Sequence, residues 1–186
     1  MAFPGASCEV IDPRIRRTRQ LLLQGLEKLL EKKEFDQISV QDIAEAATVN
    51  RATFYDHYSD KFSLLKCMVG SRFHELLAER QVDFDGCCGS ALKAIILALC
   101  DYLSQVREYK PHMESAIIAV LERIILDGLQ KQPPKDGVPV EMMAAAASWA
   151  MYGAAKQWAE TPDHCPSEQV VDTVVKLVGP ILLESA

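Results

Sequence analysis

The sequence has no net positive charge, no signal-peptide start and no apolar run long enough to cross a membrane. Its 186 residues carry a formal net charge of −6, so attraction to a polyanion would depend on a local basic cluster. The N-terminus lacks the basic start and long apolar core of a signal peptide. The longest apolar run, around residues 144–155, is short and rich in alanine. We therefore expect a cytoplasmic protein without a membrane segment.

Motifs for metal binding and catalysis are missing as well. The six cysteines have no zinc-ligand spacing and are expected to be reduced thiols. None of the four histidines has an acid or Cys partner at ligand or relay spacing, and no Gly-rich phosphate loop or nucleophile elbow is present. Cys87 and Cys88 are candidates for sensing oxidants, but nothing nearby in the sequence activates a thiol, so we interpret them as ordinary loop cysteines. No enzyme, metal or cofactor is predicted.

Strand signals and internal repeats are also missing, and apolar residues recur instead with the spacing of a helix. Residues rich in Pro and Gly separate the helical patterns, most clearly over 132–139. The predicted fold is all-α with about nine helices. These are expected over 13–30, 40–47, 51–58, 61–81, 90–106, a short segment from Pro111, 117–125, 140–160 and 167–183.

Charge is distributed unevenly along the chain. Residues 1–66 hold ten basic and ten acidic residues, whereas residues 67–186 hold ten basic and sixteen acidic residues and carry the whole net charge. The neutral part also contains a cluster of four arginines within residues 14–19. We expect a flexible tail over 1–11, an N-terminal domain over 12–66 and a C-terminal domain over 67–186.

The stretch SVQDIAEAATVNRATFYDHYSDK has the signals of two short helices joined by a tight turn, a helix-turn-helix. Ser39 and Asp42 have the spacing of a capping box, so a helix should begin at Val40. Asn50 can cap a second helix over 51–58, after the turn has broken the first. Such a motif places its second helix in the major groove of DNA.

The second helix divides into an inner and an outer face. Phe54 and Tyr58 lie four residues apart and should point into the core. The N-terminal residues of the helix are left outside, where an arginine can bond guanine, and an alanine or threonine methyl can touch thymine. These base-reading candidates are Arg51, Ala52 and Thr53. Side chains of the kinds that hold phosphates are Tyr55, His57 and Lys61.

The chain closely resembles the N-terminal signature of the tetracycline-repressor (TetR/AcrR) transcription regulators. The resemblance lies in the pattern I-A-x-x-A-x-V-x-x-x-x-F-Y-x-H-Y-x-x-K-x-x-L. The resemblance covers roughly the first third of the chain. Two positions depart from the family pattern, because Thr48 and Glu34 stand where the family usually has glycine. A β-branched residue is poorly suited to a left-handed turn, at a cost of about 1 kcal/mol. The matching residues are Ile43, Ala44, Ala47, Val49, Phe54, Tyr55, His57, Tyr58, Lys61 and Leu64.

The resemblance implies that the start of the first helix lies beside the DNA backbone. Arg14, Arg17 and Thr18 then become candidate phosphate contacts, and Gln41 is included in the same DNA-binding set. The alternative for the arginines is an ordinary solvated helix start, and both interpretations remain open.

The last two helices have apolar faces wider than a single core requires. Two adjacent stripes run along the final helix, at Val170, Val174, Leu177 and Ile181, and at Val171, Val175, Val178 and Leu182. Small residues that permit close helix approach line the helix before it, at 144–147, Ala150, Gly153 and Ala154. We expect helices 140–160 and 167–183 to form a homodimer interface, as in the family; burial within a monomer is the alternative.

The C-terminal domain could hold a pocket for a small-molecule effector, since apolar walls with a few polar anchors are what such a pocket needs. Aromatic and methionine side chains at helical spacing are also ordinary core residues, and this alternative stays open. The candidate effector-binding residues are Tyr102, Tyr109, His112, Met113, Trp149 and Tyr152.

Taken together, these features predict a homodimeric DNA-binding transcriptional regulator of double-stranded operator DNA. A repressor released by an effector is favoured, and the same fold can also serve an activator. A protein-interaction module that keeps the helix-turn-helix as a scaffold is the second hypothesis, and it would show no salt-dependent binding to DNA. A small all-α enzyme is the third, and the absence of a base–nucleophile pair argues against it.

Overall fold

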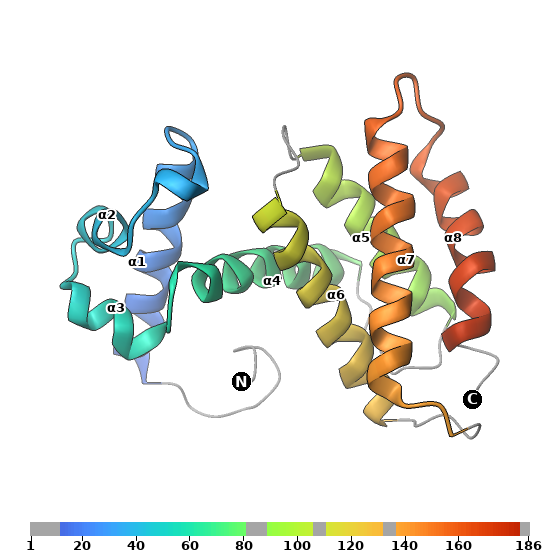
Figure 1. Cartoon of the computed structure of the whole chain (residues 1–186), viewed down its shortest axis with the longest axis horizontal. Helices are drawn as coiled ribbons and strands as arrows, with labels where there is room; N and C mark the ends of the chain where they lie inside the picture. The colour runs from blue at the N-terminus through green and yellow to red at the C-terminus, as the bar shows by residue number, and fades with distance from the viewer. Residues whose placement is uncertain (1–11, 81–88, 106–110, 132–136, 183–186) are drawn as a thin grey trace. The chain divides into compact units, whose positions relative to one another are not determined.

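The computed structural model describes residues 12–80, 89–105, 111–131 and 137–182, and all regular structure in these ranges is helical (Figure 1). The all-α prediction is confirmed. The elements are α1 (Pro13–Leu30), the 3₁₀ turn η1 (Phe35–Gln37), α2 (Val40–Ala46), α3 (Arg51–His57), α4 (Lys61–Glu79), α5 (Gly89–Gln105), α6 (Pro111–Lys131), α7 (Val140–Glu160) and α8 (Ser167–Leu182).

Eight α-helices are described where about nine were expected, because α6 is continuous over 111–131. The two helices predicted in that range are one, and Pro111 occupies its first position, where a missing N–H costs nothing. The predicted tail over 1–11, the residues Cys87 and Cys88, and Tyr109 lie outside the described residues.

The chain folds as two compact units, Met1–Ser71 and Arg72–Ala186, and α4 contributes residues to both. In the first unit, Leu22 and Leu26 on α1 are fully buried, and Asp12 caps the helix by accepting a hydrogen bond from the Arg14 N–H at 2.8 Å. Ile15, one turn or more before them, is 40% exposed, and the buried part of α1 begins only at Leu22.

Close packing of α1 on α2 depends on Gly25. A Cβ added there would lie 3.2 Å from both the Ala47 nitrogen and the Ile43 carbonyl oxygen. Both neighbours are backbone atoms that cannot rotate away, so the crossing requires glycine.

The turn between α2 and α3 is a Schellman motif with threonine in the left-handed position. Thr48 has φ +57°, its N–H donates to the Glu45 carbonyl at 3.0 Å, and the Val49 N–H donates to the Ala44 carbonyl at 2.9 Å. The motif usually places glycine at this position, because a β-branched side chain there is strained. The helix-turn-helix therefore keeps its turn despite the residue present.

Thr48→Gly should raise the free energy of unfolding by about 1 kcal/mol, because it removes the left-handed strain and leaves both backbone hydrogen bonds in place. Urea denaturation of the two proteins measures the difference. Thr53→Gly serves as the matched control, since the same loss of side chain inside α3 should lower the stability by about 0.3 kcal/mol through helix propensity alone. A lower stability of the Thr48 variant would show that threonine is not strained there.

In the second unit, α5, α6, α7 and α8 pack around a core that includes Leu99, Leu121, Met151 and Val174. α7 packs against α5, α6 and α8. Met142 and Trp149 project from the other side of α7 and are exposed. None of the helices in the described part of the chain is both long and apolar enough to pass through a bilayer.

Candidate nucleic-acid interface

The N-terminal turn of α3 is directed outward by residues at both of its ends. Asn50 accepts a hydrogen bond from the Ala52 N–H at 2.9 Å, which caps the helix where it begins. Phe54 is fully buried and Tyr58 nearly so, and together they fix the inner face. Arg51 and Ala52 are left exposed, with Thr53 half-buried beside them. The three base-reading candidates therefore share an accessible edge.

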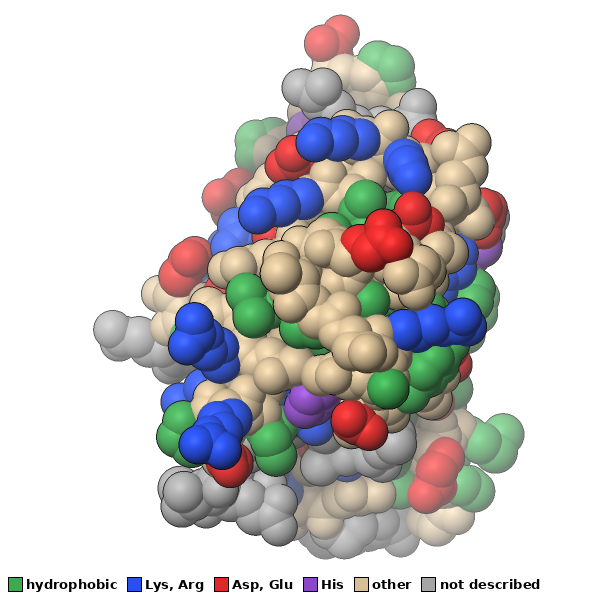
Figure 2. Space-filling view, turned by 90° about the vertical axis from the view of Figure 1, so that its left-hand side faces the viewer, with side chains coloured by type: hydrophobic (Ala, Val, Ile, Leu, Met, Phe, Trp, Pro, Cys, Tyr) green, Lys and Arg blue, Asp and Glu red, His purple; other side chains and the backbone are tan. Residues whose placement is uncertain are grey.

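Figure 2 shows the side of the molecule on which α2 and α3 lie in Figure 1. Lys and Arg side chains are scattered over this face, with Asp and Glu between them, and do not form one continuous patch. A duplex on this face would be held by separate cationic side chains at its phosphates, as expected for contacts that fix register.

Arg51 is held along its own helix by Tyr55. Its Nη2 donates to the Tyr55 hydroxyl at 3.3 Å, and its guanidinium carbon lies 5.7 Å from the centre of the tyrosine ring. Such an i, i+4 contact limits the rotamers of a long side chain. Arg51 is thereby partly ordered before any ligand arrives.

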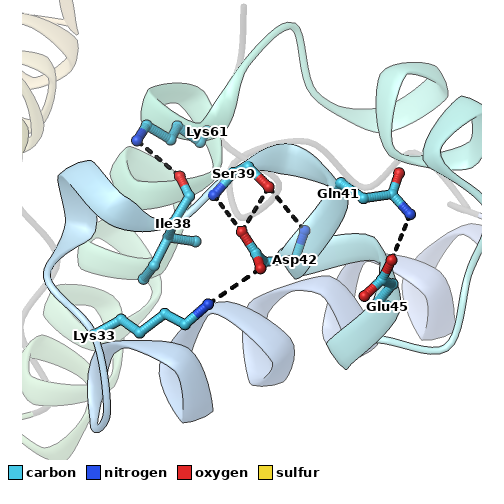
Figure 3. Close-up of polar contacts among 7 residues, drawn as sticks. All are labelled: Lys33, Ile38, Ser39, Gln41, Asp42, Glu45 and Lys61. Carbon is cyan, nitrogen blue, oxygen red and sulfur yellow. Dashed lines mark hydrogen bonds and ion pairs between the residues drawn. The ribbon is translucent and has the colours of Figure 1, made fainter.

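The start of α2 is fixed by a reciprocal capping box, as predicted (Figure 3). Asp42 Oδ2 accepts from the Ser39 N–H at 2.8 Å and the Ser39 hydroxyl at 2.6 Å, and Lys33 Nζ lies 3.2 Å from Oδ1. The hydroxyl bond is the largest of the effects that lower the pKa of Asp42 from 3.8 to about 2. The carboxylate therefore stabilises α2 at neutral pH, and this contribution is lost as the pH falls from about 4 toward 2.

Gln41 projects from the same turn of α2, and its side chain is occupied by a neighbour. Its Nε2 donates to Glu45 Oε1 at 2.7 Å, one helical turn further on (Figure 3). A DNA contact by Gln41 would first have to compete with this bond.

Lys61 was predicted to hold a phosphate, but the structure gives it a different role. Its ammonium donates to the carbonyls of Phe35 at 2.9 Å, Asp36 at 3.3 Å and Ile38 at 2.8 Å. The same nitrogen lies 4.7 Å from the centre of the Phe35 ring. A lysine has three N–H donors, and all of them are used here. We therefore correct the prediction: Lys61 fastens α4 to the segment around η1 and is removed from the phosphate contacts.

Lys61→Met should lower the free energy of unfolding by about 1–3 kcal/mol, because three backbone carbonyls lose a charged donor while the apolar stem is kept. Chemical denaturation measures the change. Lys66→Met, at an exposed position of the same helix, should have little effect. An unchanged stability, combined with a shallower salt dependence of DNA binding, would restore the phosphate contact.

The remaining phosphate candidates come from α1 and the end of α3. Arg14 and Arg17 are exposed, and the Thr18 hydroxyl donates to the Arg14 carbonyl at 3.0 Å. His57 is half-buried, and burial followed by the charge of Arg19 lowers its pKa below the ordinary 6.5. His57 is thus neutral at pH 7 and offers a neutral N–H donor.

The effector candidates in the second unit differ in how far they are exposed. Tyr102 and Tyr152 are buried; Tyr102 packs its ring 5.2 Å from that of Phe73. His112 and Met113 are half-buried at the start of α6. Trp149 was wrongly placed in a pocket, because it is 58% exposed, on a side of α7 different from the one that buries Tyr152.

Sequence reasoning missed an acidic member of this region, Glu114. Its Oε2 accepts a hydrogen bond from the Tyr152 hydroxyl at 3.2 Å and lies 2.9 Å from Lys156 Nζ. The Lys156 hydrogen bond is the largest of the effects that lower the pKa of Glu114. No pattern in the sequence joins residues about forty positions apart, so only the packing of α6 on α7 reveals the cluster. The described residues contain no group of three or more His, Cys, Asp and Glu side chains suited to a metal ion.

Comparison with known proteins agrees with this geometry. Residues 22–68 match the model of "Bacterial regulatory proteins, tetR family". The uncharacterized HTH-type transcriptional regulator YxbF of Bacillus subtilis is 40% identical over 68 residues, which cover 36% of this chain but only 18% of that protein. The HTH-type transcriptional regulator TtgR of Pseudomonas putida is 25% identical over 175 residues, covering 80% of this chain and 83% of the relative.

A similar fold is found among solved structures. Thermus thermophilus FadR, a repressor crystallised with lauroyl-CoA, superposes with a TM-score of 0.58 at 17% identity, covering 89% of this chain and 95% of that one. At this identity the likeness concerns the fold alone.

Proposed function

We propose that the chain is a member of the TetR family of bacterial regulatory proteins, whose model matches residues 22–68, and that it regulates transcription by binding an operator in double-stranded DNA through α3. The observation that supports this function is the outward edge of α3. Its cap at Asn50 and its buried anchor at Phe54 leave Arg51, Ala52 and Thr53 accessible at the N-terminal end of the helix. That is the end that reads base edges in a helix-turn-helix.

Phosphate contacts would position this reading edge. We assign them to exposed or half-buried side chains on both sides of α3, with Lys61 excluded for the reason given above. They are Arg14, Arg17, Thr18, Gln41, Tyr55 and His57. Contacts to phosphates carry no sequence information. Each of these residues should therefore contribute to affinity and to salt dependence without selecting a base.

A homodimer would supply the second reading head that a palindromic operator needs. Met142, Trp149 and Leu177 are 66%, 58% and 63% exposed on the last two helices. On α7 the exposed small residues Ala146 and Gly153 lie along the same stripe as Trp149. Large apolar side chains beside small ones, uncovered in the single chain, are suited to close helix packing between two copies.

We propose further that the protein represses transcription and that a small-molecule effector releases it from DNA. The effector would bind the second unit in a state whose two reading heads are wrongly spaced for the operator. Only a difference in affinity between the two states can release DNA. Tyr152 and the ion pair of Glu114 with Lys156 would serve as polar anchors, together with His112, Met113 and Tyr102. The protein would act on DNA in the cytoplasm.

The test is selection of bound duplexes from a random DNA library, followed by measurement of the mass of the complex. We expect an inverted repeat bound by an even number of chains. Enrichment of no sequence at low salt would contradict operator binding and turn the search to protein partners. If DNA binding requires an effector, the selection repeated in the presence of cell metabolites should enrich the inverted repeat.

A further inference from the structure

A hollow of about 360 Å³ lies within the N-terminal unit, open to solvent on one side. Its volume is at the lower end of the range for small-molecule pockets. α1 forms one wall, with side chains at i, i+3, i+4 and i+7 that share one face of the helix. The lining residues are Arg16, Arg19, Gln20 and Leu23 from α1, Tyr58 at the end of α3, and Cys67 and Ser71 from α4.

The charge of this hollow is positive and unbalanced. Two guanidinium groups line it, and none of the lining residues that the structure describes is Asp or Glu. Neither Arg16 nor Arg19 takes part in an ion pair with any residue of the described ranges. Paired arginines without a counter-ion repel each other and attract an anion.

Arg19 shows more directly that an acceptor is missing. Its Nε is fully buried and has no hydrogen-bond partner among the described residues. A buried N–H that has lost water without gaining an acceptor is costly, and such groups in folded proteins usually have a partner or a bound molecule. An anion in the hollow would supply the acceptor.

The remaining walls indicate which kind of anion fits. The Tyr58 hydroxyl is already directed to Cys67 Sγ at 3.5 Å, which leaves Gln20 and the Ser71 hydroxyl as further neutral donors. Leu23 and the Tyr58 ring add apolar surface. A planar carboxylate matches the fork of a guanidinium, and an apolar body matches the rest.

We propose that this hollow is a binding site for a small organic carboxylate, held by Arg16 and Arg19 and packed against Leu23 and Tyr58. The site lies in the N-terminal unit and is therefore distinct from the effector cluster of the second unit. A bound anion would neutralise Arg19, whose charge acts on His57 at the end of α3. Binding of the anion would thus change the pKa of His57, which lies at the end of the helix that we assign to DNA binding.

The test uses the full-length protein without DNA and benzoate as the probe, so its result does not depend on operator binding. Isothermal titration calorimetry should show one benzoate bound per chain at this site. Arg19→Gln and Arg16→Gln should each weaken binding by at least about tenfold, because each removes a charge-assisted hydrogen bond. Lys28→Gln, which removes the same charge at an exposed position of α1, should leave the affinity unchanged.

Two further arms address the chemistry. Benzamide keeps the ring but not the charge, and acetate and inorganic phosphate keep the charge but not the ring; all three should bind at least about tenfold more weakly. In NMR titrations, benzoate should raise the pKa of His57, and it should not do so in the Arg19 variant. Circular dichroism verifies that each variant is folded, and Arg16→Gln, at an exposed position, keeps the test valid if Arg19→Gln does not fold.

Benzoate affinity that is the same in both arginine variants would overturn the site. If benzamide bound as tightly as benzoate, the site would not select an anion. If phosphate or acetate bound as tightly as benzoate, the site would not select an apolar body.

Discussion

Arg51→Ala should weaken binding to the selected operator by about 1–3 kcal/mol for each half-site and should relax the preference at one base pair. Arg51 is exposed at the outer end of α3 and is partly ordered by Tyr55. An arginine held in this way loses little further freedom when it forms two hydrogen bonds to guanine. The measurement is competition binding against operators that carry each of the four bases at every position of a half-site.

Arg17→Ala is the matched control for this experiment. It removes the same charge from an exposed position of α1, where we assign a phosphate contact. It should weaken all sequences alike and reduce the slope of log affinity against log salt by about one. If Arg51→Ala also weakened all sequences uniformly, Arg51 would hold a phosphate and the base-reading role would be rejected.

The N-terminal unit was predictable from sequence wherever a signal is local. Ser39 and Asp42 are three residues apart, so the capping box is visible in the sequence and α2 begins where it predicts. Asn50 likewise precedes α3 directly. The turn at Thr48 shows the limit of propensity, because packing and two backbone hydrogen bonds override the threonine's preference.

Contacts between distant residues were not predictable. Lys61 has the residue type and position of a phosphate contact, but its acceptors lie 23 to 26 residues earlier, near η1. Only the packing of α4 brings them within reach. The hollow beside Arg19 has the same origin, since one wall comes from α1 and another from α4.

Trp149 was misplaced for a related reason. α7 is apolar on more than one side, so periodicity does not distinguish the side that faces the core from the side that faces a partner. Tyr152 lies three residues further on and is 2% exposed, whereas Trp149 is 58% exposed. Burial separates the two roles, and the exposed apolar stripe then becomes evidence for assembly.

Trp149→Glu should convert the proposed homodimer to a monomer and weaken operator binding by about 10²–10⁴-fold. A charge in the middle of an apolar interface loses its water and gains no partner there, so association becomes unfavourable. A monomer engages one half-site and loses the effective concentration that links two half-sites, which is the origin of the loss. Analytical ultracentrifugation measures the mass, and binding to the operator and to an isolated half-site measures the affinity.

The two DNA ligands separate loss of assembly from damage to the reading head. Affinity for the isolated half-site should be unchanged in Trp149→Glu, because α3 and its cap belong to the other unit. Ala78→Glu adds the same charge at an exposed position of α4 and should remain dimeric. A dimeric Trp149→Glu variant would show that this stripe is not the interface, and the second reading head would then have to be supplied through another surface.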